Sequence, residues 1–402
     1  MLYSFFKMRL FTPEEKQFIQ EHLHQDPATL MLQARRYPQL PVLELVQQIQ
    51  ARQKAAQKLP TWAHNPDTVF PVLLSVEQSS SEQTAAFKAS LLSGKLLVDL
   101  TGGFGVDSLY FARHFEKVVH LEQNPELQEI AAYNFKLLGA GNIQSINTTA
   151  EEYLKAFTGK ADVIYLDPAR RGHQHEKLHL LQDCEPDVLH LLPLLFQKAD
   201  AVLLKTSPML DIDQAVEQLG CVSRLWVIAV QNEVKEVLYL LQAGAPAPTE
   251  AARTAVNLLA QAPAQTLDFS RASEEAATPR YTDPMQFVYE PNAAILKAGA
   301  FKTVAQKYDI GKLHPNSHLY TSAILVPDFP GRSFQCMAIS RYHKKELLKH
   351  LPAKKANITV RNFPEPVAEI RRKTGIKEGG DIYLLFTTDM HQKPIVLVCR
   401  KA

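Results

Sequence analysis

The stretch VDLTGGFGVDSLYFA, residues 98–112, places an aspartate and three glycines between an apolar run and a helical pattern. The run KLLVDL (95–100) is typical of a short buried strand, and VDSLYFARHF (106–115) is typical of a helix. Glycines let a backbone approach a ligand closely, and the first turn of a helix offers N–H groups without partners inside the helix. We therefore expect a ligand-binding turn here, although a tight turn without a ligand has the same pattern.

A second carboxylate follows at the end of the next apolar run. Glu122 closes KVVHLE (117–122), where a carboxylate suits the two ribose hydroxyls of an adenosine-containing cofactor. Two such cofactors compete, a dinucleotide and S-adenosylmethionine. The dinucleotide pattern G-x-G-x-x-G lacks its third glycine here, because Ser108 stands in that place. Asp99 would repel a pyrophosphate but attract the cationic methionine part of S-adenosylmethionine, so the residues favour the latter cofactor.

The segments around this turn alternate between strand and helix patterns. Strands are expected at 95–100, 117–122, 142–148, 161–167 and 200–206, with helical segments between them. Such alternation predicts a parallel, doubly wound α/β sheet. The next two runs, 222–230 and 234–241, are separated only by QNE, so they must form an antiparallel hairpin.

The flanking regions have other patterns. Residues 11–58 show helical spacing with Thr12 as an N-cap, and 60–71 form a proline-rich connector. Ser79 to Glu82 fits a capping box, so a helix is expected to start near residue 80. Residues 254–270 are compatible with another hairpin inside a loop-rich stretch, and about the last 70 residues alternate as a small α+β unit.

Charge is distributed unevenly along the chain. Residues 1–290 carry 25 Lys+Arg against 34 Asp+Glu, a net charge of −9, whereas residues 291–402 carry 19 against 8, a net charge of +11. A basic C-terminal quarter indicates a polyanionic partner such as nucleic acid. A solvated lysine-rich surface would give the same count, because such potentials concern association and not the fold.

Composition also excludes several classes of protein. The four cysteines show no metal-type spacing, and we expect a reduced, cytoplasmic protein. The first residues do not resemble a signal peptide, and no apolar run approaches the ~18 residues of a membrane span. His173, His175 and His179 cluster without a completing carboxylate pattern, so we expect a polar loop on the substrate side and no metal.

The motifs together resemble those of class I S-adenosylmethionine-dependent methyltransferases. VDLTGGFG resembles their first motif, with Thr101 in place of the usual first glycine, and Glu122 matches the acidic end of their second strand. In NTTAEEYL (147–154), Thr149 replaces the usual acid beside the adenine, so Thr149, Ala150 or Glu151 could supply that contact. LDPAR (166–170) fills the fourth-strand motif, which in amino methyltransferases is D/N-P-P-Y/F.

The resemblance narrows to one bacterial family. SVEQSSSEQTAAFKA (75–89), DLTGGFGVDS, LDPARR and YEPNAAILKAG (289–299) are similar to methyltransferases that carry a THUMP-like C-terminal domain. This implies an α/β fold: a Rossmann-like, seven-stranded methyltransferase sheet with an N-terminal helical region and a small C-terminal α+β domain. The expected parts are an N-terminal helical region (1–70), the methyltransferase domain (71–243), a hairpin or linker (244–280), a small ferredoxin-like insert (281–328) and the THUMP-like domain (329–402).

The resemblance also implies a site. The expected S-adenosylmethionine-binding residues are Ser80, Thr84, Asp99, Thr101, Gly103, Gly105, Asp107, Glu122, Gln123 and Thr149. The expected catalytic residues are Asp167, Pro168, Ala169 and Arg170. The implied reaction is methylation of an exocyclic amine of an RNA base, in tRNA or rRNA, with the basic C-terminal domain holding the RNA.

Other readings of the resemblance stay open. The chain could be a relative that keeps the cofactor fold but methylates a small molecule, or a non-catalytic RNA-binding protein. A base C5-methyltransferase would need a nucleophilic cysteine after the fourth or fifth strand. LLKTSPMLD (203–211) contains none, and Cys184 is interpreted as an inert core thiol.

Overall fold

The computed structural model describes residues 9–170 and 181–402, and the chain forms two compact units. Unit 1 contains the residues up to 223 together with 238–245, and unit 2 contains 224–237 and 246–402. The predicted histidine cluster and Arg171 lie outside the described residues. This division is coarser than the five parts expected from the sequence, whose boundaries stay predictions.

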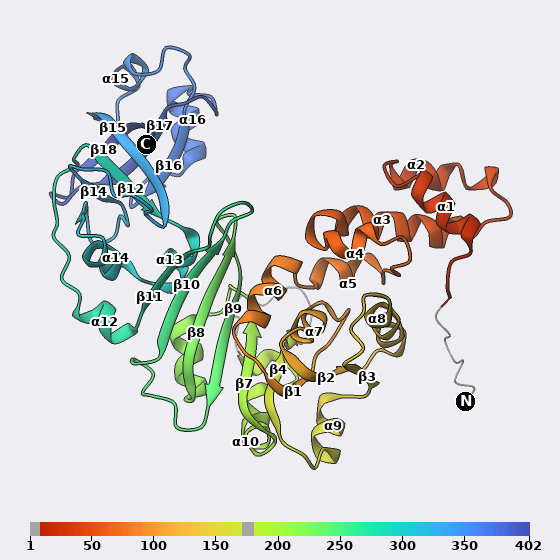
Figure 1. Cartoon of the computed structure of the whole chain (residues 1–402). Coiled ribbons are helices and arrows are strands. Elements are labelled where there is room, and N and C mark those ends of the chain that lie inside the picture. The colour runs from red at the N-terminus through yellow and green to blue at the C-terminus, as the bar shows by residue number, and fades with distance from the viewer. Residues whose placement is uncertain (1–8, 171–180) are drawn as a thin grey trace. The chain divides into compact units, whose positions relative to one another are not determined.

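Unit 1 begins with a group of helices (Figure 1). These are α1 (Pro13–Glu21), α2 (Pro27–Leu32), the 3₁₀ turn η1 (Ala34–Arg36), α3 (Val42–Lys58), α4 (Pro60–His64) and α5 (Leu73–Gln78). Thr12 caps α1 in a capping box with Glu15, as the sequence predicts. The buried Arg52 of α3 donates to the carbonyl oxygens of Asn65, Pro66 and Thr68, which fastens the proline-rich connector to the helix.

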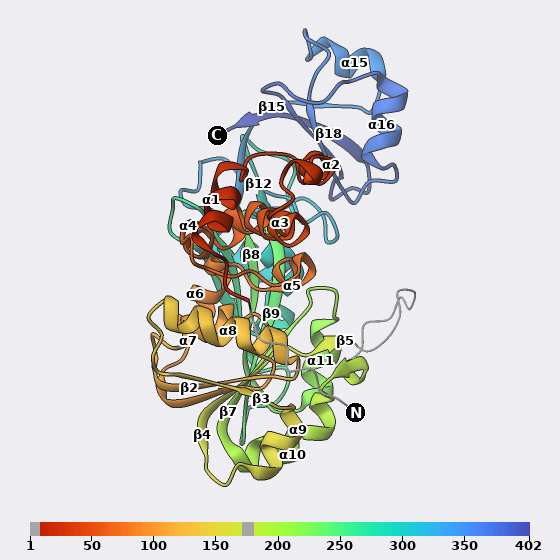
Figure 2. The same cartoon turned by 90° about the vertical axis from the view of Figure 1, so that its right-hand side faces the viewer.

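The expected sheet follows in unit 1. Its parallel strands are β1 (Gly94–Asp99), β2 (Phe115–Glu122), β3 (Ile143–Asn147), β4 (Ala161–Leu166) and β7 (Ala199–Thr206). Its helices are α6 (Glu82–Ser90), α7 (Val106–Phe111), α8 (Pro125–Leu137), α9 (Ala150–Ala156), α10 (Val188–Lys198) and α11 (Ile212–Leu219). Figure 2 shows α7 and α8 on one face of these strands and α9 and α10 on the other, as a doubly wound fold requires.

The expected hairpin is present, and the sheet continues beyond it. β8 (Val222–Val230) and β9 (Glu233–Gln242) are joined by Gln231 and Asn232, whose φ angles of +50° and +67° are typical of a tight hairpin turn. β10 (Ala252–Leu258) and β11 (Gln265–Phe269) form the second hairpin. The strand order is β11-β10-β8-β9-β7-β4-β1-β2-β3. The seven methyltransferase strands are therefore extended to nine, because β10 pairs in parallel with β8 instead of remaining a linker.

Unit 2 also contains a second sheet of seven strands, in the order β13-β14-β12-β15-β18-β17-β16. The strands are β12 (Phe287–Pro291), β13 (Gly311–Lys312), β14 (Tyr320–Ser322), β15 (Gly331–Ser340), β16 (Asn357–Arg361), β17 (Tyr383–Thr388) and β18 (Pro394–Lys401). The helices of unit 2 are α12 (Arg271–Ala276), α13 (Ala293–Ala298), α14 (Phe301–Lys307), α15 (Lys344–Lys349) and α16 (Val367–Thr374). The small α+β unit expected at the C-terminus is thus part of a larger sheet.

The predicted start of α6 is wrong by two residues. Ser81, and not Ser79, is the N-cap, because its hydroxyl accepts the N–H of Thr84. Ser79 instead closes α5, where its N–H donates to the carbonyl of Ser75. Several serines stand side by side here, and the sequence pattern alone does not distinguish them. Ser79 is taken up by the end of α5, so Ser81 caps α6.

Two exclusions can be checked on the described part of the chain. None of its helices combines the length and apolar character that a membrane span needs. Within residues 9–170 and 181–402, no three His, Cys, Asp or Glu side chains gather as metal ligands would.

Asn134 provides a test of how the connector is held. This buried α8 side chain accepts the N–H of Val69 at 3.1 Å and donates to its carbonyl at 2.8 Å. Asn134→Ala leaves two buried backbone groups without partners, so we expect a loss of about 2–4 kcal/mol. The urea midpoint of unit 1, followed by circular dichroism, should fall, whereas the exposed Gln144→Ala should leave it nearly unchanged. Equal midpoints for both variants would contradict this role.

Candidate active site

The glycine turn after β1 is built so that side chains are excluded from it. Gly105 has a φ of +89°, and a Cβ there would lie 2.4 Å from the ring of Phe135. A Cβ on Gly102 would lie 2.2 Å from the buried ring of His120. The turn therefore needs glycine at these two positions for its backbone conformation and for close packing on β2 and α8. Gly103 differs, because a Cβ there would meet nothing nearer than the Thr101 carbonyl oxygen at 4.0 Å.

Glu122 joins the end of β2 to this turn. Its carboxylate accepts the N–H of Gly103 at 2.9 Å and the N–H of Asn124 at 2.7 Å. The amide of Asn147 donates to the backbone carbonyls of Glu122 and Gln123, which ties β3 to the same edge. Burial raises the pKa of Glu122. The Glu122 carboxylate thus borders the glycine turn at the place where the ribose of an adenosine cofactor would lie.

Asp99 lies beneath the turn and holds it. Its carboxylate is 1% exposed and accepts the Ser108 hydroxyl at 2.6 Å and the Thr101 N–H at 3.1 Å. Burial raises the pKa of Asp99 to about 7 because these two hydrogen bonds do not offset the loss of solvent. Repulsion from Asp107 and Asp167 acts in the same direction.

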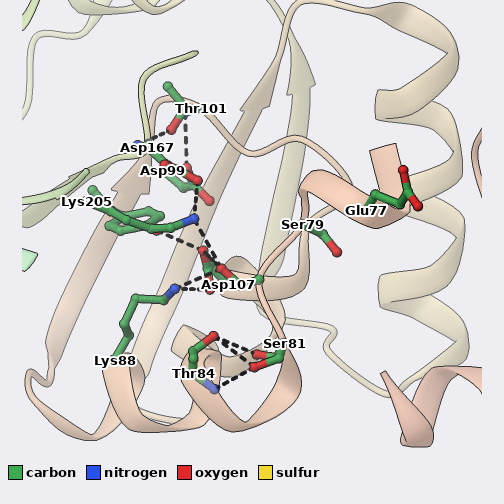
Figure 3. A network of polar contacts seen from close by, with 12 residues as sticks. Glu77, Ser79, Ser81, Thr84, Lys88, Asp99, Thr101, Asp107, Asp167 and Lys205 are labelled. Carbon is green, nitrogen blue, oxygen red and sulfur yellow. Dashed lines mark hydrogen bonds and ion pairs between the residues drawn. The ribbon is translucent and has the colours of Figure 1, made fainter. Parts of the chain in front are cut away.

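Asp107, in the first turn of α7, is the centre of a polar network (Figure 3). It pairs with Lys88 at 3.0 Å and accepts the hydroxyls of Ser80 and Tyr165, each at 2.8 Å. Burial alone would raise the pKa of Asp107, but the charges of Lys88 and Lys205 outweigh that effect and lower it. The aspartate therefore stays ionised inside the site.

Asp167 follows β4 and reaches both the turn and β7. Its N–H donates to the Thr101 hydroxyl at 2.6 Å, and its carboxylate pairs with Lys205 of β7 (Figure 3). The side chain of Asp167 is 35% exposed, so its carboxylate is reachable, whereas that of Lys205 is 12% exposed. The pair lies at the carboxyl ends of neighbouring parallel strands, which is where such sheets bind ligands.

The structure brings five of the fourteen predicted site residues into one polar network. Hydrogen bonds or ion pairs connect Ser80, Asp99, Thr101, Asp107 and Asp167 through Ser108, Tyr165, Lys88 and Lys205. The roles of the individual residues stay predictions.

Two predicted threonines are engaged in helix caps. Thr84 bonds with Ser81 in the first turn of α6. Thr149 caps α9 in a capping box with Glu152. Each threonine hydroxyl thus makes a hydrogen bond at the start of a helix. The contacts of Thr84 and Thr149 with the cofactor stay predictions.

The residues after Asp167 form a short strand. β5 (Ala169–Arg170) pairs antiparallel with β6 (Cys184–Glu185), which follows the 3₁₀ turn η2 (Leu181–Asp183). Pro168 lies between Asp167 and this strand, and the side chain of Arg170 lies outside the described part. The register places Cys184 opposite Arg170, so this cysteine lies on the strand next to the predicted catalytic motif.

Four residues of the network were not predicted as site residues: Lys88, Ser108, Tyr165 and Lys205. Lys88 is a fully buried helix lysine, and such a residue needs an acidic partner. Tyr165 and Lys205 lie near the carboxyl ends of β4 and β7, which are neighbours in the parallel sheet. Their ends meet at one edge, so the strand order alone could have identified Lys205 as a site residue.

Comparison with known proteins finds similarity in the C-terminal region and along nearly the whole chain. Residues 287–330 match a ferredoxin-like domain family, and residues 331–401 match a THUMP domain-like family. The crystal structure of a protein from Porphyromonas gingivalis W83, assigned as a methyltransferase, is 33% identical, with 98% of this chain and 100% of that chain covered and a TM-score of 0.87. The chain belongs to this methyltransferase family. The predicted family with its THUMP-like C-terminal domain is therefore confirmed.

Curated relatives include methyltransferases, one of them named for its cofactor. An uncharacterized S-adenosylmethionine-dependent methyltransferase of Mycobacterium tuberculosis (strain ATCC 25618 / H37Rv) is 22% identical over 78% of this chain and 82% of its own. A tRNA/tmRNA (uracil-C(5))-methyltransferase of Musicola paradisiaca is 30% identical, but the match covers 28% of this chain and 40% of that relative. The predicted cofactor, S-adenosylmethionine, is confirmed for the family. The glycine turn fits it, because Gly103 faces open space beside the Glu122 carboxylate, which can accept hydrogen bonds from ribose hydroxyls.

The raised pKa of Asp99 predicts a pH dependence. The folded carboxyl binds a proton up to about pH 7 and the unfolded one only to about pH 4, so ionisation of Asp99 destabilises the unliganded protein as the pH rises between these values. A cationic ligand favours the ionised form. We therefore expect the affinity for S-adenosylmethionine, which carries a sulfonium and an ammonium group, to rise up to tenfold per pH unit below 7 and to level off above it.

Calorimetric titrations between pH 5.5 and 8.5 check this expectation. The Asp99→Asn variant should bind S-adenosylmethionine more weakly than the wild type, and its affinity should change little over this pH range. A wild-type affinity that does not change with pH would show that this carboxyl does not respond to the ligand.

Proposed function

We propose that this methyltransferase transfers a methyl group from S-adenosylmethionine to an exocyclic amine of an RNA base. The observation that carries the proposal is the placement of Asp167. Its partly exposed carboxylate lies at the end of β4, and its own N–H is bonded to Thr101 of the cofactor turn. A base amine bound to this carboxylate would thus lie beside the cofactor. Such a substrate implies action in the cytoplasm.

The chain mainly needs to position the reactants. S-adenosylmethionine supplies an electrophilic methyl carbon on a sulfonium. Asp167 would accept a hydrogen bond from the amine and draw its lone pair away from the base ring toward that carbon. The backbone carbonyls of Pro168 and Ala169 follow along the same edge and would face the same amine. Proximity and orientation of this kind can account for much of the barrier to transfer.

The proton balance also involves Asp167. Attack by nitrogen breaks the sulfur–methyl bond and leaves a positively charged methylated amine, which must lose one proton to become the neutral product. The carboxylate that accepted the amine hydrogen bond is placed to receive this proton or pass it to water. A base must leave its stack to reach such a site, so the substrate would be single-stranded or flipped.

The RNA would be held by unit 2. Lys344, Lys345 and Lys349 of α15 are exposed, and within the described chain no ion pair engages them. The basic residues of α16 differ, because Arg372 and Lys373 pair with acidic neighbours. The net charge of +11 over residues 291–402 and the THUMP domain-like match support α15 as part of a phosphate-binding surface.

Methylation of uracil C5 is a second candidate, because a relative with that name matches part of the chain. That chemistry needs a nucleophilic cysteine. The residues that end β7 and follow it, Thr206 and Ser207, supply none, but Cys184 lies on β6 opposite Arg170. The amine reaction is favoured because it uses the carboxylate that the fold places beside the cofactor turn.

Asp167→Ala separates cofactor binding from chemistry. We expect methyl transfer to fall at least 100-fold because the amine loses its acceptor, while the Kd for S-adenosylhomocysteine changes less than threefold. The assay measures incorporation of labelled methyl into total RNA from a strain that lacks the gene, followed by nucleoside mass spectrometry. Cys184→Ala is the control and should remain active.

Two product outcomes would contradict the proposal. A methyl group at uracil C5, lost in Cys184→Ala, would establish the second candidate. Absence of any RNA product from the wild-type protein would favour a small-molecule substrate or a non-catalytic role.

Charge removal on α15 tests the RNA surface. Lys344→Gln with Lys345→Gln should weaken RNA binding and reduce the slope of log K against log salt by about 1.5, because each lost phosphate contact removes ~0.7–0.9. Filter binding from 50 to 300 mM KCl measures both quantities. The matched control, Lys95→Gln with Lys117→Gln, removes two exposed lysines from unit 1 and should leave the slope unchanged. Equal slopes in the two double variants would show that α15 is not part of the RNA-binding surface.

A further inference from the structure

Lys205 occupies a position that the predicted reaction leaves without a role. It lies in β7, next to β4 in the sheet, and its ammonium group pairs with Asp167 (Figure 3). A second contact, to the Ser80 hydroxyl, is 3.4 Å long. Lys205 therefore reaches from the polar network beneath the cofactor turn to the carboxylate proposed to bind the target amine.

The Asp167–Lys205 pair presents an acceptor and a donor side by side. A carboxylate only accepts hydrogen bonds and an ammonium only donates them. Together they offer the pattern of a carboxamide side chain, which recognises adenine through an amine and the neighbouring ring nitrogen. An ion pair at the open edge of a site can thus bind two adjacent atoms of a base and fix its orientation.

We propose that Lys205 is a substrate-binding residue that determines specificity, donating a hydrogen bond to the unprotonated ring nitrogen next to the amine that Asp167 binds. This rests on the proposed function and adds which edge of the base is bound, namely the amine together with the unprotonated ring nitrogen beside it. Adenine, cytosine and guanine have this edge. Uracil has no amine and would not place a nucleophile between Asp167 and the methyl group.

The contacts of the two lysines show why Lys205 and not Lys88 has this role. Lys88 is completely buried, with Asp107 at 3.0 Å and the Ser80 hydroxyl at 2.8 Å. Lys205 is partly exposed and pairs with the partly exposed Asp167. Its contact to Ser80 is the longer of the two lysine contacts to that hydroxyl, so a ring nitrogen could replace it at little cost.

The test measures methyl transfer and cofactor binding in the full-length protein. Lys205→Met removes the donor but keeps the length of the side chain, and Lys205→Arg keeps a donor. The control, Lys160→Met, removes a lysine from an exposed ion pair with Asp200 in the same unit. Labelled S-adenosylmethionine and total RNA from a strain without the gene give kcat and KM for RNA. Calorimetry gives the Kd for S-adenosylhomocysteine, and thermal melting checks the fold.

We expect Lys205→Met to lower kcat/KM for RNA at least 50-fold, with the Kd for S-adenosylhomocysteine within threefold of wild type. Lys205→Arg should retain at least ten times the activity of Lys205→Met, and Lys160→Met should match wild type. Nucleoside mass spectrometry should find the methyl group on an exocyclic nitrogen.

Several results would overturn the inference. Activity of Lys205→Met within threefold of wild type would do so, as would equal losses in Lys205→Met and Lys205→Arg. A parallel loss of cofactor binding or melting temperature would show that Lys205 only supports the structure. These outcomes leave the proposed function standing, because wild-type activity remains. A wild-type protein that methylates no RNA would overturn both.

Discussion

The hydrogen bond from the N–H of Asp167 to the Thr101 hydroxyl joins the two halves of the site. At 2.6 Å it connects the turn after β1 to the end of β4. The glycine turn alone could hold a nucleoside, and the end of β4 alone could present a carboxylate. This bond fixes one relative to the other, so that a methyl donor and its acceptor would meet at a defined distance. A glycine at position 101 would offer no hydroxyl for it.

The charges of the site are balanced over a small volume. Asp99, Asp107 and Asp167 come within reach of only two described lysines, Lys88 and Lys205. Burial raises the pKa of Asp99, the most buried of the three, to about 7, and repulsion from Asp107 and Asp167 acts in the same direction. The charges of Lys88 and Lys205 lower the pKa of Asp107. The lysines thus decide which carboxylates stay charged, and a cationic cofactor would supply the remaining positive charge.

The sequence predicted those features that are determined by residues close together in the chain. The glycine turn, Glu122, the end of β4 and the hairpin at Gln231 and Asn232 depend on residues close in the chain. The partners of Asp107 could not be predicted in this way, because Lys88 and Tyr165 reach it from separate elements. The same limit applies to β10, whose pairing with β8 depends on the edge that β8 leaves open and not on a sequence motif.

The two family matches in unit 2 describe one structural body. β12 belongs to the ferredoxin-like match and β15 to the THUMP-like match, yet they pair in one sheet. Glu290 of β12 is 2% exposed, and its carboxylate accepts hydrogen bonds from Arg332 of β15 at 2.7 Å and from Arg361 of β16 at 2.9 Å. Removing either arginine would leave this buried charge partly unpaired, which is costly.

An RNA surface on α15 would therefore rest on more than the THUMP-like segment. α15 follows β15 directly in the chain, and β15 is hydrogen-bonded to β12 on one side and to β18 on the other. Leu347 of α15 is buried in one apolar core with Leu384 and Phe386 of β17, so packing against the sheet holds α15 in place. RNA bound there would meet a rigid surface, and recognition would depend on how the lysines are spaced on that helix and not on ordering a flexible arm.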